Sequence, residues 1–82
     1  MKIKEAYELT KAALIGAGIE EFESDCGLII SEVTKKSVLS IKLSPDEMLS
    51  ESEEKRLFEI TERRKRREPL QFILGYAYFM GL

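Results

Sequence analysis

The chain has 82 residues, of which 13 are Lys or Arg and 15 are Asp or Glu, so its formal net charge is −2. A chain of this length builds one domain with one modest core, and 44% apolar beside 34% charged residues is typical of a folded domain. With no His and one Cys, the sequence excludes an internal disulfide and a zinc site of the usual Cys and His spacing, and it argues against hydrolytic chemistry.

Two amphipathic helices are predicted in the first part of the chain. Apolar and small residues over 3–17 fall on one side at helical pitch, and Gly16 and Gly18 favour a helix end. The two glycines resemble a phosphate loop only weakly, because no strand precedes them. A second apolar stripe over 22–33 contains Cys26, which we expect to fill the core.

The middle of the chain allows more than one interpretation. Residues 36–43 fit one or two helical turns or an alternating strand, and we favour a short helix because a single strand would lack a partner. Ser44 followed by Pro45 suits a helix start, and so does the capping-box spacing of Ser50 and Glu53. Either can begin the next helix, or a short turn can precede one long helix.

That helix is expected to run to about Arg67, with an apolar patch followed by a stretch without apolar residues. The patch is formed by Leu57, Phe58 and Ile60. Arg64 projects onto the same side, so its aliphatic stem can lie on the patch while its guanidinium needs a carboxylate. We predict an ion pair between Arg64 and Asp25, which lies at the edge of the preceding apolar stripe.

Four further cations lie at the carboxyl end of this helix: Arg63, Lys65, Arg66 and Arg67. The spacing of Glu59 to Arg63 and of Glu62 to Arg66 favours ion pairs along the helix. The four cations either form a solvated helix end or contact acidic side chains on a partner protein.

Two other functions are compatible with these features. Five consecutive bases over 63–67 suggest a small helical module that binds nucleic acid or the ribosome. The net charge of −2 and the absence of aromatic residues within the run argue against direct nucleic-acid binding. An adaptor or dimerisation domain is the third possibility.

The end of the chain, residues 72–82, has nine apolar residues, two glycines and no charge. It is too short to span a membrane, so we expect it to pack on a partner that lies partly outside this chain. Pro69 suits the first turn of a short helix that ends at Gly75, and residues 76–79 suit a strand. No signal peptide or membrane span is evident, and we expect a cytoplasmic protein.

The last part of the sequence resembles one family. Residues 68–75, Glu-Pro-Leu-Gln-Phe-Ile-Leu-Gly, with Arg63-Arg64 before them and Phe-Met-Gly-Leu at 79–82, resemble the end of the amino-terminal domain of the release-factor glutamine methyltransferases, the HemK or PrmC family. Residues 25–30 are similar to the Asp-Ala-Glu-Leu-Leu-Leu run of the family's second helix. Phe72 stands where the family usually has Tyr, and Gly27 replaces a better helix former.

The resemblance implies an all-α fold. Residues 1–75 would form a bundle of four to five short helices that recognises the substrate. Residues 76–82 would begin a β-hairpin linker to a Rossmann-like catalytic domain that is missing here. The linker region would include Gln71, Phe72, Gly75, Tyr78 and Phe79.

The resemblance also implies an activity for the intact enzyme. Members transfer a methyl group from S-adenosylmethionine to the glutamine of the Gly-Gly-Gln motif in class I peptide-release factors. The family's Asn-Pro-Pro-Tyr motif and glycine-rich cofactor loop are absent from this sequence, so we expect no catalytic, cofactor-binding or metal residue in this chain. The expected partners are a class I release factor and the enzyme's own catalytic domain, with no membrane and no direct nucleic acid.

Overall fold

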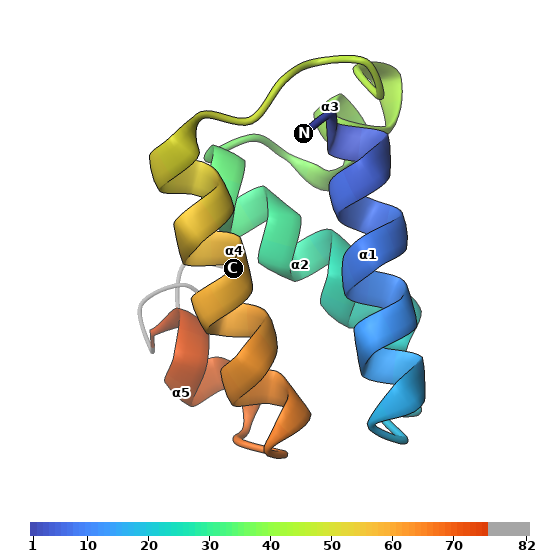
Figure 1. The fold of residues 1–82 in the computed structure, drawn as a ribbon, viewed down its shortest axis with the longest axis vertical. Helices are drawn as coiled ribbons and strands as arrows, with labels where there is room; N and C mark the ends of the chain where they lie inside the picture. The colour runs from blue at the N-terminus through green and yellow to red at the C-terminus, as the bar shows by residue number, and fades with distance from the viewer. Residues whose placement is uncertain (76–82) are drawn as a thin grey trace.

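The computed structural model describes residues 1–75, and this part of the chain folds as a bundle of helices (Figure 1). The helices are α1 (Ile3–Gly16), α2 (Phe22–Thr34), α3 (Val38–Leu43), α4 (Glu51–Lys65) and α5 (Leu70–Leu74). The predicted all-α class and number of helices are confirmed. The strand predicted over residues 76–79 lies outside the described residues.

Helix α2 is the centre of the bundle. It lies behind α1 and α4 in the view of Figure 1, and it contacts each of the other described helices. Its apolar stripe includes Cys26, Ile29 and Ile30, which are fully buried in one cluster with Leu14 of α1 and Leu57 of α4. Burial of each large aliphatic side chain stabilises the fold by roughly 1.5–3 kcal/mol. The bundle is therefore held together mainly through α2.

The start of α4 settles the alternatives left open by the sequence. Ser50 Oγ accepts a hydrogen bond from the Glu53 backbone at 3.2 Å, and Glu53 Oε1 accepts one from the Ser50 backbone at 2.7 Å. This is the capping box that the spacing predicted, and it satisfies two backbone donors at the helix start. Ser44 instead begins a short turn, in which its carbonyl accepts from Glu47 N.

The start of α1 is fixed by the loop between α3 and α4. The Ile3 backbone N–H donates to the Glu47 carbonyl at 2.8 Å, and the Lys4 N–H donates to the Pro45 carbonyl at 3.0 Å. The first N–H groups of a helix have no partner within the helix, so these carbonyls take the place of a side-chain cap. The upper ends of α1 and α3 are thereby joined.

Three details of α4 differ from the prediction. The helix ends at Lys65, two residues before the expected end, and Arg67 has a positive φ of 66°. Phe58 was expected in the buried patch but is 46% exposed, because it lies about 100° around the helix from its buried neighbour Leu57. Neither of the predicted pairs along the helix joins Arg63 or Arg66 to an acid four residues earlier; Arg63 binds Glu68 instead.

No helix within residues 1–75 is long and apolar enough to cross a membrane.

Candidate functional site

Arg64 and Asp25, which the sequence suggested as an ion pair, lie together between α4 and α2. Arg64 Nε is 2.7 Å from Asp25 Oδ2, and the two side chains are only 15% and 8% exposed. Arg64 Nη1 also donates to the Glu68 carbonyl at 3.0 Å, so the same guanidinium fixes the turn that follows α4. A buried charge needs such partners. Arg64 therefore has a structural task and does not face a partner protein.

Arg67 joins the end of α4 to the loop between α1 and α2. Its Nη2 atom donates to the carbonyls of Ala17 and Gly18 at 3.1 and 3.4 Å. Gly18 has a φ of +77°, and a Cβ atom added there would lie 2.9 Å from Arg67 Nη2. The loop thus needs glycine at position 18 for its backbone conformation and for the close approach of the guanidinium. Arg67 fills the space beside the two glycines that resembled a phosphate loop.

The remaining bases of the basic turn, which we define as residues 63–68, are partly engaged. Arg63 is 3.0 Å from Glu68, and this contact raises the pKa of Arg63 and lowers that of Glu68. Lys65 is 3.4 Å from Glu62. Within residues 1–75, no hydrogen bond or ion pair holds the side chain of Arg66. Of the four cations suggested for partner binding, Arg66 is thus the one that its own chain leaves most available in the described part.

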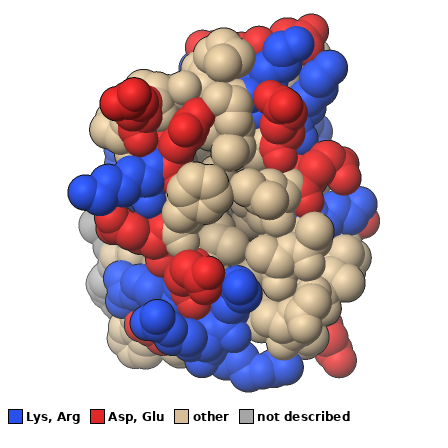
Figure 2. All heavy atoms as spheres, in the orientation of Figure 1, with Lys and Arg blue, Asp and Glu red and all other residues tan. Residues whose placement is uncertain are grey.

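A second surface feature is the α1–α4 groove, a hollow of about 230 Å³ between these two helices. It is lined by Leu9, Thr10 and Ala13 of α1 and by Phe58, Thr61, Glu62 and Lys65 of α4. Figure 2 shows this face, with uncharged side chains between α1 and α4 and with Lys and Arg gathered below them, over the carboxyl end of α4. Leu9 and Phe58 flank the groove and are 47% and 46% exposed. The groove is thus an open, mainly apolar surface beside the basic turn.

The floor of the α1–α4 groove contains a polar group that the fold does not use. Thr61 is 7% exposed, and its Oγ1 atom has no hydrogen-bond partner among the described residues. A buried hydroxyl without a partner destabilises a fold by about 1–3 kcal/mol. The opposite wall has the fully buried Thr10.

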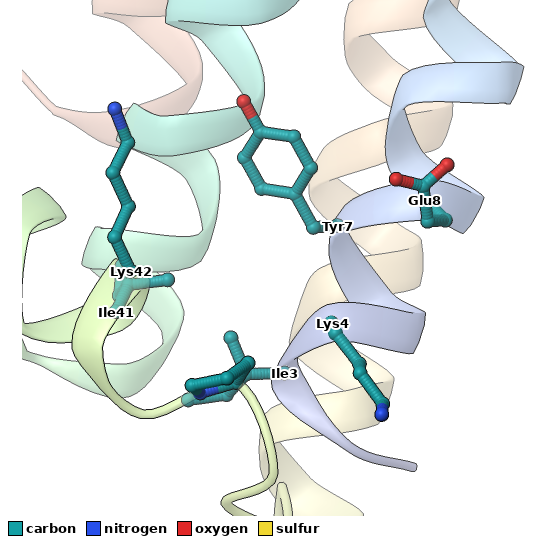
Figure 3. A pocket seen from close by; sticks show the side chains of 7 residues that line it. Ile3, Lys4, Tyr7, Glu8, Ile41 and Lys42 are labelled. Carbon is teal, nitrogen blue, oxygen red and sulfur yellow. The ribbon is translucent and has the colours of Figure 1, made fainter.

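A pocket of about 300 Å³ lies at the other end of α1, near α3. Ile3 and Tyr7 of α1 face Ile41 and Lys42 of α3 across it, while Glu8 lies on the outer side of α1 (Figure 3). The Tyr7 hydroxyl is directed toward the Glu23 carbonyl at 3.5 Å, and burial raises its pKa. This pocket brings together apolar walls but no pair of groups suited to acid–base or nucleophilic chemistry.

Cys26 is not a reactive thiol. It is fully buried, and burial together with the neighbouring Asp25 carboxylate raises its pKa to about 12. The thiolate, which is the nucleophilic and metal-binding form, is therefore scarce at neutral pH. Among residues 1–75, no three acidic or sulfur-bearing side chains are grouped as a metal site would need. The described surface is suited to binding a partner rather than to catalysis.

The predicted linker residues divide between the described and the undescribed parts of the chain. Gln71 and Phe72 lie on α5, whose Phe72 side chain is 68% exposed. Gly75 follows the helix with a φ of +95°. Tyr78 and Phe79 lie outside the described residues.

Comparison with known proteins identifies the family. The sequence profile described as the PrmC N-terminal domain matches residues 5–75, which is most of the chain. The chain belongs to the PrmC N-terminal domain family. The match ends where α5 gives way to Gly75, so the profile covers the whole helical bundle.

Two curated relatives of this PrmC domain are named release factor glutamine methyltransferase. The protein from Clostridium botulinum is 36% identical over 78 residues, which cover 95% of this chain and 26% of the relative. The protein from Agrobacterium fabrum is 33% identical over 69 residues, which cover 84% of this chain and 24% of the relative. The chain thus spans about a quarter of the length of these relatives. No solved structure gives a significant match.

Sequence reasoning drew attention to the basic turn of the PrmC domain and missed the α1–α4 groove. The groove joins residues that lie about fifty positions apart, and helical periodicity alone does not tell which exposed residues of two helices meet. The available signal was the position of Leu9 and Phe58, each beside its helix's buried stripe rather than within it.

Proposed function

We propose that this chain is the substrate-recognition domain of a release factor glutamine methyltransferase and that it binds a class I peptide-release factor. The observation that carries the proposal is family membership over residues 5–75. The names of the two curated relatives support it. A cytoplasmic location follows from this partner.

In the whole enzyme, S-adenosylmethionine would supply the methyl group, and the acceptor would be the glutamine side chain of the partner's Gly-Gly-Gln motif. Residues 1–75 do not fit this cofactor, because no strand there leads into a glycine-rich loop at a helix start, and Arg67 occupies the space beside Gly18. We therefore assign the cofactor and the chemical step to the three quarters of the relatives that this chain does not cover, and residues 76–82 to the linker toward it.

The geometry of the described domain supports a positioning role. Arg64 and Arg67 tie the end of α4 to α2 and to the loop after α1, so the helices present their exposed faces in one fixed arrangement. Methyl transfer needs the acceptor held in line with the donor, and a rigid accessory domain can contribute to this alignment away from the reacting atoms. The pairing of Arg63 and Lys65 with their own chain leaves fewer bases for nucleic acid.

A binding titration tests the proposal. The 82-residue chain is titrated by calorimetry against a purified class I release factor at low and at moderate salt. An acidic protein of similar size and unrelated function serves as the control. We expect saturable binding to the release factor alone, weakened by salt because Arg66 lies at the edge of the surface. No saturation up to about 100 μM, which corresponds to roughly 5 kcal/mol of affinity, would contradict a recognition role for this domain.

A further inference from the structure

We infer that the α1–α4 groove is the part of this domain that receives the release factor, and that its occupant is an amphipathic helix of that partner. This inference rests on the proposed function and makes it more specific. It names a surface, a binding mode and a charge pattern for the partner segment.

The first argument is the shape and chemistry of the groove. Two helices that diverge over an apolar floor offer the setting in which an amphipathic helix places its apolar face. The exposed side chains of Leu9 and Phe58 flank this floor from opposite sides. Apolar residues scattered singly over a surface need no explanation, but two large ones on either side of a hollow form a connected patch.

The second argument is the unpartnered hydroxyl of Thr61. This side chain is 93% buried on the floor of the groove, and its Oγ1 atom has no partner among the described residues. A helical Thr can donate to the carbonyl four residues earlier, but no such bond is present here. A polar group of an occupant that reaches the floor would satisfy this hydroxyl.

The third argument is the distribution of charge along the groove. In Figure 1, α1 and α4 run in the same direction, so their carboxyl ends lie together. Lys65 and Arg66 lie at this end, and Arg66 shares a hollow with Phe58. Glu5 and Glu8 lie toward the other end, in a shallow hollow that contains Leu9. The groove therefore changes from acidic to basic along its length.

This gradient selects the occupant. A helix with basic residues over the Glu5 and Glu8 end, and acidic residues over the Lys65 and Arg66 end, matches it with opposite charges. The ion pair between Lys65 and Glu62 does not obstruct such binding, because both side chains are largely exposed and surface pairs of this kind are weak.

The test compares groove variants with a matched variant outside the groove. Leu9→Asp and Phe58→Asp are titrated against the class I release factor beside Leu39→Asp, which makes the same type of change at a 67% exposed position on α3. We expect the two groove variants to bind at least about tenfold more weakly, and the α3 variant to bind within about twofold of the unmodified domain. Circular dichroism melts verify that all three variants fold.

A second comparison tests the charge gradient. Arg66→Glu is expected to weaken binding several-fold and to reduce its salt dependence. Lys42→Glu makes the same change in net charge on α3, outside the groove, and is expected to have a smaller effect. Equal effects of the two charge reversals would mean that only the net charge of the domain matters, and this would overturn the charge pattern assigned to the partner.

The outcomes separate the two proposals. If the unmodified domain does not bind the release factor, the proposed function fails. If it binds, and the groove variants bind as well as Leu39→Asp, only the groove inference is overturned. A second copy of this chain is the competing occupant, because two antiparallel copies would also bring acidic ends to basic ends. A dimer that Leu9→Asp dissociates, while release-factor binding is unchanged, would assign the groove to that second copy and overturn the inference.

Discussion

The basic turn and the α1–α4 groove lie on the same helix, yet they use their side chains in opposite ways. In the basic turn, Arg64 and Arg67 bind groups of their own chain, and Arg63 binds Glu68. In the groove, Leu9 and Phe58 remain about half exposed, and the Thr61 hydroxyl is unused by the described fold. A run of charge thus serves mainly to hold the domain together, whereas the less conspicuous apolar residues form the surface left for a partner.

The largest effect is expected from breaking the buried ion pair of the basic turn. Arg64→Ala leaves the Asp25 carboxylate without its partner in a buried position, and we expect a loss of about 3 kcal/mol of unfolding free energy. Urea denaturation measures it. Arg66→Ala, two positions away and without a described partner, is the control and should change the stability by no more than about 0.5 kcal/mol. Small, equal losses for the two variants would mean that Arg64 does not hold α4 to α2.

Gly18→Ala is expected to disturb the second tie of the basic turn. The added Cβ would lie 2.9 Å from Arg67 Nη2, at a residue whose φ is +77°. We expect a destabilisation of about 1–2 kcal/mol, measured by thermal melting. The control is Gly16→Ala in α1, where nothing lies within 4 Å of the added atom and alanine is the better helix former. That variant should be neutral or slightly stabilising, and a stable Gly18→Ala would show that the loop does not need glycine.

Thr61→Val is expected to stabilise the isolated domain. The substitution removes a buried hydroxyl without a described partner and keeps the shape of the side chain, so we expect a gain of about 1 kcal/mol. The urea midpoint measures this gain. A loss of stability would reveal that the hydroxyl already has a partner in the folded domain, and the groove would then lack an unused polar group.

The smallest effect concerns the exposed pair of Arg63 and Glu68. The Arg63 guanidinium lowers the pKa of Glu68 below its usual value of 4.5. A carboxylate with a lowered pKa in the folded state stabilises the fold above its unfolded pKa, and this contribution is lost as the pH falls through the folded value. Glu68→Gln should therefore melt slightly below the unmodified domain at pH 7, and the difference should disappear in acid. A difference that persists below about pH 3 would not come from this ion pair.

Local patterns in the sequence predicted most of the fold. Helical periodicity indicated the helices, and Ser50 with Glu53 indicated the start of α4, because these signals involve residues within one or two turns of each other. The partnership of Arg64 with Asp25 was also accessible, since a cation on an apolar stripe requires a carboxylate on a facing stripe.

The rest depended on which distant side chains meet. The reach of Arg67 to Ala17 and Gly18 depends on the left-handed backbone at Arg67, which no propensity of arginine predicts. The α1–α4 groove depends on the relative rotation of two helices, and this rotation is set by packing against α2. Phe58 was placed in the core for the same reason: its hydrophobicity was evident, but its angular position relative to Leu57 was not weighed.

The most direct test of the account follows the amide NMR signals of the isotope-labelled domain as a class I release factor is added. We expect the largest shifts and line broadening in residues 9–13 of α1 and 58–66 of α4, with little change in α3. Strongest changes in α3 or α5, with the groove signals unaffected, would contradict the claim that this domain recognises its partner through the α1–α4 groove.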